Sequence, residues 1–246
     1  MCSLSEHKLS MKPVVMMKKI GLVGGITWHS TIEYYREINL ETGRRLGGVR
    51  SAVLAIESLD FEEITRLGAQ DREDEVFARF LAAAQSLTRS GADVIALCAN
   101  TAHRRADRLE EEMGRPLVQI GDAIGDAVRA AGLSRVGLLG TARTMTEPFL
   151  RQRLVGKHGL EVLVPDAPVC SEIDRFIFGE MAAGVFSQQA RDAVLRASAQ
   201  LVARGAQGVI LGCTELPLLM RGIEMPVPSF DTTRLHAVSI VDAALA

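Results

Sequence analysis

Lysine is scarce in this chain, and the positions of the few lysines disfavour pyridoxal phosphate chemistry. Five lysines occur in 246 residues, and four of them precede or open the first predicted strand. An enzyme that uses pyridoxal phosphate needs a buried lysine that faces the cofactor. Lys157, the fifth, is followed by His158 and Gly159, where a helix is predicted to end in solvent. The sequence therefore predicts an activity without this cofactor.

Cysteine is also sparse, and its spacing excludes the usual structural uses. The four cysteines stand at positions 2, 98, 170 and 213, without the Cys-x-x-Cys pairs typical of zinc sites. We therefore expect neither a metal site nor a disulfide framework, and we expect reduced thiols in a cytoplasmic protein. Cys2 and Cys170 stand in no motif and are interpreted as incidental.

The chain lacks an excess of either charge, and it lacks any long apolar run. Its 28 Lys and Arg nearly balance 30 Asp and Glu, so no large basic surface is available for a nucleic acid. No stretch approaches the roughly 18 apolar residues of a membrane span, and residues 1–17 lack the apolar block of a secretory signal. We expect a cytoplasmic protein that binds neither nucleic acid nor membrane, with residues 1–17 as a flexible extension.

Short apolar runs with β-branched residues alternate with longer amphipathic stretches along most of the chain. This alternation is typical of strand–helix units in a parallel sheet, and it predicts an α/β fold. Strands are predicted over residues 19–24, 52–57, 93–98, 116–120, 135–140, 160–164, 207–212 and 226–230. Helices are predicted over residues 30–46, 72–90, 101–114, 121–132, 143–157, 171–204 with a break near Gly184, and 232–245.

Three landmarks of the first half recur in the same order in the second half. Residues 20–25 resemble residues 136–141, each half has one cysteine after an apolar strand, and similar segments begin at Pro116 and Pro226. We therefore expect two similar α/β lobes related by a pseudo-twofold axis, each with a mainly parallel sheet, and an active site in the crevice between them. The predicted first lobe contains residues 18–115 and 230–246, and the second contains residues 116–229.

Cys98 and Cys213 are each predicted to end a strand and to precede a helix. Ligands bind at the carboxyl edge of open parallel sheets, where helix N-termini supply free N–H groups and partial positive charge. We expect these N-termini to bind a carboxylate and to lower the pKa of the thiols. In facing lobes, one thiolate can remove a proton from a carbon while the opposite thiol delivers another, which is the geometry that racemisation needs.

The carbanion formed in such a reaction needs hydrogen-bond donors aimed at the neighbouring carboxylate. Suitable substrate-binding side chains follow the predicted strands, namely Asn100, Thr101, Thr141, Thr144 and Thr214. A single buried cysteine at a strand end is more often a small core residue. Two matching positions, each followed by hydroxyl or amide residues, favour the catalytic interpretation.

Other residues near these positions have two interpretations each. His103 is either a proton relay or a packing residue, and Glu215 either orients Cys213 or simply favours a helix N-terminus. Arg50 is a candidate ligand for a substrate carboxylate. The glycine loop at residues 21–28 lacks the Gly-x-Gly-x-x-Gly spacing of a dinucleotide site, so we expect a tight turn that brings backbone amides to the crevice.

Several motifs together resemble the aspartate/glutamate racemase family. They are GGITWHST (24–31), CANTAH (98–103), GT (140–141), GCTE (212–215) and FDTT (230–233), and the resemblance covers residues 18–246. It implies a two-lobed α/β fold and an amino-acid racemase that needs neither pyridoxal phosphate nor metal. It also implies catalysis by Cys98 and Cys213 and assembly as a homodimer. The first loop is most similar to the broad-specificity branch, and the resemblance places Gly25, Ile26 and Thr27 beside the substrate.

The chain departs from the family pattern at positions that contact the substrate side chain. Ile26, Thr27 and His29 stand where the broad-specificity branch typically has methionine, serine and glutamate, and Arg50 stands where it usually has histidine. Aspartate-specific members resemble a pattern with an arginine and a lysine on the distal carboxylate. Matching residues are not evident here, since Ser171 falls near the expected lysine. We therefore expect Arg50 to be the substitute partner.

Two other classes of function stay open. Relatives in the same superfamily decarboxylate small dicarboxylates, isomerise them as maleate isomerases do, or racemise hydantoins. The decarboxylases there tend to keep one cysteine, whereas this chain has both. From a different class, an inactive small-molecule binder that keeps the crevice would show ligand-induced thermal stabilisation without turnover.

Overall fold

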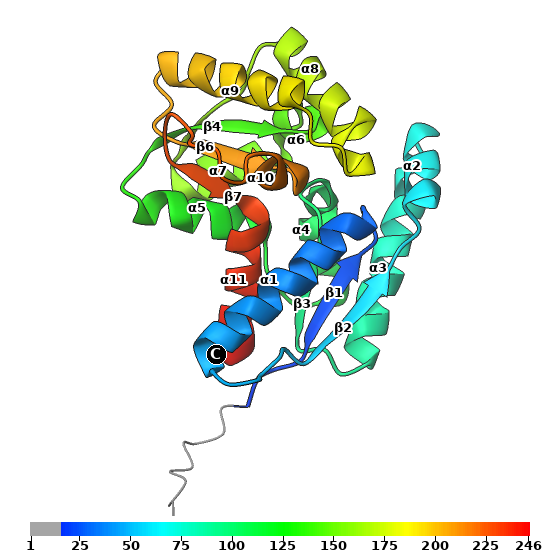
Figure 1. Cartoon of the computed structure of the whole chain (residues 1–246). Coiled ribbons are helices and arrows are strands. Elements are labelled where there is room, and N and C mark those ends of the chain that lie inside the picture. Colours follow the sequence, from blue (N-terminus) through cyan, green and yellow to red (C-terminus); the bar gives the residue numbers. More distant parts are fainter. Residues whose placement is uncertain (1–15) are drawn as a thin grey trace, which may run out of the picture.

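The computed structural model describes residues 16–246, which form two parallel β-sheets flanked by helices (Figure 1). The extension predicted over residues 1–17 lies almost wholly outside the described residues. The predicted α/β fold is confirmed. The first sheet has the order β2-β1-β3 and contains β1 (Ile20–Gly24), β2 (Leu54–Ser58) and β3 (Val94–Leu97). The second has the order β5-β4-β6-β7 and contains β4 (Arg135–Gly140), β5 (Glu161–Leu163), β6 (Val209–Gly212) and β7 (Ser229–Asp231).

The strand order is the same in both sheets. β1 pairs with β2 and β3, and β4 pairs with β5 and β6, so the first strand of each half lies inside its sheet. Val118 forms an isolated parallel bridge with Ala96 of β3, at the position that β7 holds beside β6. The strand predicted over residues 116–120 is reduced to this bridge, because helix α5 (Ile120–Ala130) already begins at Ile120. The shared order agrees with the internal repeat in the sequence.

Helices cover both faces of each sheet. The chain returns to the first lobe at its end, because α11 leaves β7 of the second sheet and packs on α1 (Figure 1). Around the first sheet lie α1 (Trp28–Leu46), α2 (Phe61–Ala69), α3 (Glu73–Arg89), the 3-10 helix η1 (Thr101–Arg105), α4 (Ala106–Met113) and α11 (Thr232–Leu245). Around the second lie α5, α6 (Ala142–Thr146), α7 (Pro148–His158), α8 (Ala167–Gly179), η2 (Met181–Ala183), α9 (Gln188–Ala203) and α10 (Glu215–Leu219).

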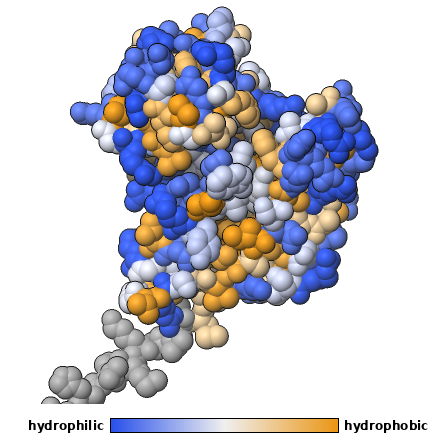
Figure 2. Space-filling view, turned by 45° about the vertical axis from the view of Figure 1, so that its right-hand side comes forward, coloured by the Kyte–Doolittle hydropathy of each residue, from blue (hydrophilic) through white to orange (hydrophobic). Residues whose placement is uncertain are grey.

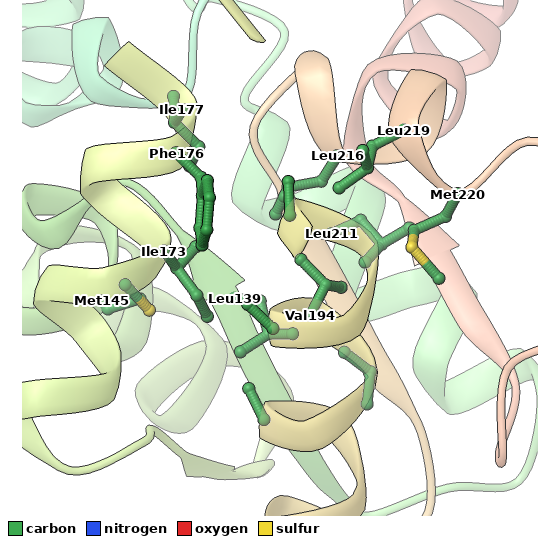
Figure 3. Close-up of a cluster of buried hydrophobic side chains, with 14 of the residues drawn as sticks. Leu139, Met145, Ile173, Phe176, Ile177, Val194, Leu211, Leu216, Leu219 and Met220 are labelled. Carbon is green, nitrogen blue, oxygen red and sulfur yellow. The ribbon is translucent and has the colours of Figure 1, made fainter. Parts of the chain in front are cut away.

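Four buried clusters form the core, one on each face of each sheet. In β1, Leu22 packs with α1 and α11, whereas Val23 packs with α3 on the other face. β1, β3 and β6 are buried along their whole length, as expected for parallel strands covered on both sides. Figure 3 shows the cluster under α8 and α9, where Leu139 of β4 packs with Phe176 and Val194.

The helices differ from the predicted ones at three places. α2 and α10 lie outside the predicted helices, although Asp60 caps α2 by accepting a hydrogen bond from the Glu62 N–H at 3.0 Å. The helix predicted over residues 143–157 is divided into α6 and α7, because Glu147 precedes Pro148 and is extended. Among residues 16–246, no helix is long and apolar enough to cross a membrane.

Candidate active site

A cavity of about 440 Å³ lies between the two lobes. Its lining comes from the segments that follow β1, β3, β4 and β6, so it lies at the carboxyl edges of both sheets, with α2 and α8 adding apolar walls. Figure 2 shows that the outer surface of the region of α2 and α3 is mostly hydrophilic, in contrast with these walls. The predicted site residues in the lining are Ile26, Thr27, Asn100, Thr101, Thr141, Thr144, Cys213, Thr214 and Glu215.

Cys213 lines the cavity, and a carboxylate fixes its thiol. It directly follows β6, is partly exposed, and donates a hydrogen bond from Sγ to Oε2 of Glu215 at 2.8 Å. The hydroxyl of Thr214 donates to the same oxygen at 2.9 Å, and it lies 2.7 Å from the hydroxyl of Ser30 at the start of α1. Because the Thr214 proton goes to Glu215, Ser30 is the donor in this last bond, which joins the two lobes. Glu215 is 6% exposed, so its charge is held by these contacts rather than by bulk water.

The pKa of the Cys213 thiol is raised well above its usual value, so the expected decrease is wrong. Burial is the largest cause, and the carboxylate of Glu215 adds to it because a second nearby negative charge is unfavourable. The backbone N–H groups of Thr214 and Glu215 act in the expected direction, but they do not outweigh burial. α10 has only five residues, so few aligned peptide dipoles stand behind these groups.

Cys98 directly follows β3, where it holds the position in the first lobe that Cys213 holds in the second. Its side chain is 1% exposed, packs in the apolar cluster of β1, α1 and α11, and is not part of the cavity lining. Its neighbours Ala99 and Asn100 line the cavity, as does Tyr34 from the same cluster. Burial raises the pKa of the Cys98 thiol far above its usual value. Cys98 thus lies behind the cavity wall, whereas Cys213 is part of it.

A hydrogen-bond chain from the first lobe to the second orients Asn100. Its Nδ2 donates to Oγ1 of Thr232 at 3.0 Å, and the hydroxyl of Thr232 donates to the carbonyl of Leu211 at 3.0 Å. Since the Thr232 proton is directed to Leu211, the amide group of Asn100 must be the donor, and its Oδ1 points elsewhere. This oxygen is buried and has no hydrogen-bond partner in the described part of the chain. It is available to a donor group of a ligand in the cavity.

Two buried hydroxyl groups at the cavity, Oγ1 of Thr27 and of Thr233, also have no hydrogen-bond partner within residues 16–246.

The loop before Thr27 depends on Gly25, whose N–H donates to Oγ1 of Thr31 at 2.8 Å. Gly25 has a φ of 87°, and a Cβ atom there would lie 2.0 Å from the carbonyl oxygen of Leu59. Gly25 was predicted to lie beside the substrate, but it is not among the residues that line the cavity, and it shapes the loop instead.

The turn after β4 places two more predicted hydroxyl groups in the cavity. Oγ1 of Thr141 accepts a hydrogen bond from the Thr144 N–H at 3.2 Å, and the two hydroxyl oxygens lie 3.0 Å apart. Asp174 of α8 accepts from the Ala142 N–H at 2.6 Å and holds the same turn. The Thr141–Thr144 hydrogen bond and the Asp174 carboxylate together fix this turn in the second lobe.

Arg50 does not reach the cavity. It is exposed and precedes β2, which runs parallel to β1, whereas the cavity lies at the carboxyl edge of that sheet. α1 separates the two ends of the lobe, and its 19 residues span about 28 Å. The prediction that Arg50 binds a substrate carboxylate is therefore wrong, because the strand direction puts it at the opposite edge.

His103 is neutral and structural. Its Nε2 accepts a hydrogen bond from the Ile120 N–H at 3.2 Å, so Nδ1 carries the proton and donates to the carbonyl of Ala99 at 2.9 Å. Burial lowers its pKa to about 4. Because backbone groups occupy both ring nitrogens, the packing interpretation of His103 holds and the relay interpretation does not.

Tyr34 and His236 form a second neutral pair in the first lobe. Nε2 of His236 lies 2.7 Å from the carbonyl of Val118, which can only accept, so Nδ1 accepts from the Tyr34 hydroxyl at 2.8 Å. Burial lowers the pKa of His236 to about 3 and raises that of Tyr34. The negative charge of a Cys98 thiolate would act on Tyr34 and raise its pKa further. Tyr34 and His236 are thus uncharged near neutral pH.

Further cavity residues were not selected by the sequence patterns. α2 and α8 supply apolar side chains, and the signal for α2 was available in the capping Asp60 followed by apolar positions 61, 64 and 67. The three arginines of the lining carry no such periodic signal, because the spacing of arginines does not distinguish one in a cavity from one in solvent. The additional lining residues include Ser30, Thr233, Phe61, Ile64, Phe178, Arg104, Arg105 and Arg143.

The chain is similar to known proteins over most of its length. Residues 23–240 match the family model described as Asp/Glu/Hydantoin racemase. A crystal structure from Yersinia pestis that carries an Asp/Glu racemase assignment is 43% identical, with a TM-score of 0.88 over 94% of this chain and 100% of that one. An aspartate racemase homologue from Pyrococcus horikoshii OT3 is 35% identical, with a TM-score of 0.81 over 93% of this chain and 99% of that one.

A curated relative matches over a shorter stretch. A glutamate racemase from Herpetosiphon aurantiacus is 31% identical over 135 residues, which are 54% of this chain and 51% of that protein. The match thus spans about half the length of this relative. The family model and the two solved structures cover nearly the whole described part. The chain belongs to the Asp/Glu/hydantoin racemase family.

Proposed function

We propose that this chain interconverts the L and D forms of an α-amino acid, either aspartate and glutamate or a broader range, with Cys213 and Cys98 as paired bases. The observation that carries the proposal is the Cys213–Glu215 hydrogen bond in a cavity between two lobes. A thiol next to a buried carboxylate has a proton acceptor already in place. Family membership supports the reaction class.

The unpartnered polar atoms of the cavity match the two charged groups of an amino acid. Oδ1 of Asn100 can accept from the substrate ammonium group, while the hydroxyl groups of Thr27 and Thr233 can donate to the α-carboxylate. Donors at the carboxylate stabilise the carbanion as charge moves into that group. A bound amino acid would thereby satisfy three buried polar atoms that otherwise carry a free-energy cost.

The proton transfers follow from these contacts. The Cys213 thiol gives its proton to Glu215, and the resulting thiolate removes the α-proton of the substrate. The Cys98 thiol then delivers a proton to the opposite face of the carbanion, which leaves Cys98 as the thiolate and Cys213 as the thiol. Return of the Glu215 proton to Cys98 through solvent restores the starting state. The substrate ammonium favours each thiolate by its opposite charge, and the raised pKa of the thiols makes their thiolates strong bases.

Cys98 must reach the substrate for this mechanism to operate. Its thiol lies behind Tyr34, Ala99 and Asn100, so substrate binding has to displace part of this wall. Local rearrangement around a ligand is a common feature of enzyme sites. The proposal therefore includes a closed and an open position of the wall in front of Cys98.

The direct test is a racemisation assay on purified protein. Each enantiomer of aspartate, glutamate and a panel of neutral amino acids is incubated with the protein, and the enantiomeric composition is read by chiral chromatography. Conversion of at least one amino acid in both directions supports the proposal. Thermal stabilisation by these amino acids without any conversion would instead identify an inactive binder and refute the proposal.

The proposed reaction uses no cofactor. Of the lysines within residues 16–246, none lines the cavity, and Lys157 of α7 forms an ion pair with Asp122 of α5 at 2.8 Å. A Schiff base to pyridoxal phosphate would need such a lysine in the site. Racemisation should therefore persist after treatment with hydroxylamine and with a metal chelator. Loss of activity that added pyridoxal phosphate or metal restores would contradict this part of the proposal.

One observation favours a decarboxylase as the second candidate. Only one of the two paired thiols, Cys213, lies in the cavity lining, and one-thiol chemistry suffices to protonate the carbanion that decarboxylation leaves. Incubation with small 2-substituted malonates and measurement of released carbon dioxide tests this function. Carbon dioxide release without racemisation of any amino acid would replace the first proposal by this one.

We also propose that the protein is a homodimer in the cytoplasm. α1 exposes four large apolar side chains, and three of them, Trp28, Ile32 and Tyr35, are at helical spacing and each more than half exposed. Such a stripe on a helix is typical of a protein–protein contact. Light scattering after size-exclusion chromatography should give twice the 26.6 kDa mass of one chain, and a monomer mass would contradict the dimer.

A further inference from the structure

One part of the cavity lining is rich in arginine. Arg104 and Arg105 belong to η1 of the first lobe, and Arg143 belongs to α6 of the second. Nε of Arg104 lies 2.6 Å from a carboxylate oxygen of Glu147, and Arg105 is ion-paired with Glu73. The charges of these two arginines are therefore balanced inside the protein.

Arg143 differs from both of them. It is exposed, and no Asp or Glu oxygen of residues 16–246 lies within 4.0 Å of its guanidinium group. Its backbone is nevertheless fixed, because Ala142 is held by Asp174 and the Arg143 carbonyl accepts from the Glu147 N–H at 2.9 Å. Its positive charge contributes to the lowering of the pKa of Arg105, so the two groups lie in the same part of the cavity. Arg143 thus presents an unbalanced charge from a fixed turn.

The walls of the cavity offer a path from the proposed reaction centre to this arginine. Phe61 and Ile64 of α2 and Ile177 and Phe178 of α8 line the same cavity as Cys213. Methylene groups of a substrate side chain can pack on such walls, while a charged end group needs a polar partner. The cavity therefore suits a side chain that is apolar near Cα and charged at its end.

We propose that Arg143 is the specificity-determining residue that binds the distal carboxylate of an acidic substrate side chain. The inference rests on the proposed racemisation and replaces Arg50 in the role that the sequence suggested. A guanidinium group binds a carboxylate through two parallel N–H···O bonds, which an uncharged amide of the same shape cannot match. Arg143 thereby separates glutamate from glutamine and aspartate from asparagine.

The opposite charge preference is the main competing outcome. Asp174 also lines the cavity and could attract a cationic side chain, although one of its oxygens already accepts from the Ala142 N–H. Lysine and ornithine therefore belong in the substrate panel. A wild-type preference for lysine over glutamate would overturn the assignment of Arg143.

The experiment compares R143Q and R143K with the wild type on glutamate and glutamine. R143Q should lower kcat/KM for glutamate about tenfold, mainly through KM, and leave glutamine within about twofold. The kcat/KM of R143K for glutamate should lie between those of the wild type and R143Q, because lysine keeps the charge and loses the paired geometry. The matched control is R129Q, which removes an exposed arginine from α5 outside the cavity and should leave both substrates unchanged. Equal losses on glutamate and glutamine in R143Q would overturn the proposal.

A binding measurement separates this inference from the proposed function. Calorimetry of D- and L-glutamate with wild type and R143Q does not depend on turnover. Weaker binding to R143Q by about tenfold, with no racemisation in the wild type, would uphold the role of Arg143 and refute racemisation. Equal binding to both proteins would overturn the role of Arg143 even if the wild type racemises glutamate.

Discussion

Cys98 and Cys213 occupy equivalent positions in two lobes of the same strand order, yet their surroundings differ. Each directly follows the strand beside the first strand of its sheet. The residue two positions later is Asn100 in the first lobe and Glu215 in the second. Asn100 donates away from its cysteine to Thr232, whereas Glu215 accepts the thiol proton of Cys213 directly. Cys98 is closed off in an apolar cluster, and Cys213 is open to the cavity.

This difference shows that equivalent positions of two similar lobes can have very different surroundings. A racemase must accept both enantiomers, but its two bases do not have to share one environment, since each needs only to reach its own face of Cα. The thiol of Cys213 donates to an adjacent carboxylate, while Cys98 shares its cluster with the neutral Tyr34 and depends on burial alone for its raised pKa.

Loss of the open thiol should have the largest effect. C213A removes the proposed base that touches Glu215, and racemisation should fall on the order of 10³-fold or more in both directions. C98A should show a similar loss, because each turnover of the proposed mechanism needs both thiols. C170A is the matched control, since Cys170 is a buried cysteine of the second lobe whose Sγ donates to the Pro165 carbonyl away from the cavity. Full activity in C213A or in C98A would refute the paired-base mechanism.

Removal of the carboxylate should separate thiol acidity from catalysis. E215Q deletes a charge that raises the pKa of Cys213, so this pKa should decrease and alkylation of Cys213 should begin at lower pH. Racemisation should nevertheless fall about 10²-fold, because an amide cannot accept the thiol proton. The two readouts are the pH profile of iodoacetamide labelling and the kcat of racemisation. Unchanged kcat together with a lower pKa would limit Glu215 to an electrostatic role.

Chemical labelling should report the difference in exposure directly. Iodoacetamide should modify Cys213 at least about tenfold faster than Cys98 in the free protein, because labelling needs both access and a thiolate. Peptide mass spectrometry gives the rate at each site. Equal rates would mean that the wall of Tyr34, Ala99 and Asn100 is already open without substrate. Slow labelling of both sites that depends on unfolding would mean that neither thiol is accessible.

Acid should weaken the fold through the two neutral histidines of the first lobe. Burial lowers the pKa of His103 to about 4 and that of His236 to about 3, whereas both have a value near 6.5 when unfolded. Below pH 6.5 the unfolded chain therefore takes up protons that the folded chain does not. The free energy of unfolding should fall by about 1 kcal/mol per pH unit for each histidine between pH 6.5 and 5.

Urea unfolding followed by circular dichroism at several pH values checks this slope. H236Q leaves one of the two histidines, so its stability should fall about half as steeply with decreasing pH. A wild-type free energy of unfolding that stays constant from pH 6.5 to 5 would contradict the neutral buried state of both rings.

The sequence alone predicts much of the framework. Most predicted strands agree with the observed ones within two residues, since apolar β-branched runs between turns leave little choice of structure. The meeting of Thr141, Thr214 and Glu215 in one cavity also follows, because the ends of parallel strands share one edge. The same rule could have excluded Arg50 from the cavity, because Arg50 precedes β2 instead of following it.

Other features depend on packing that the sequence does not display. The closure around Cys98 results from the way that Tyr34 of α1 and the distant α11 meet β3, and neither contact has a local signal. The direction of both thiol pKa shifts depends on the balance of burial against nearby N–H groups, and the spacing of residues in the sequence does not determine this balance. The exposed Arg143 becomes distinct only when the ion pairs of Arg104 and Arg105 are known.

Deuterium incorporation during racemisation tests the central claim most directly. A pure enantiomer of an accepted amino acid is incubated with the wild type in heavy water, and both enantiomers are separated at low conversion. Thiols on opposite faces of Cα should put solvent deuterium into the product enantiomer and leave the recovered substrate largely protonated. Equal deuterium content in both enantiomers from the start would mean that one base serves both faces, and it would contradict the pairing of Cys98 with Cys213.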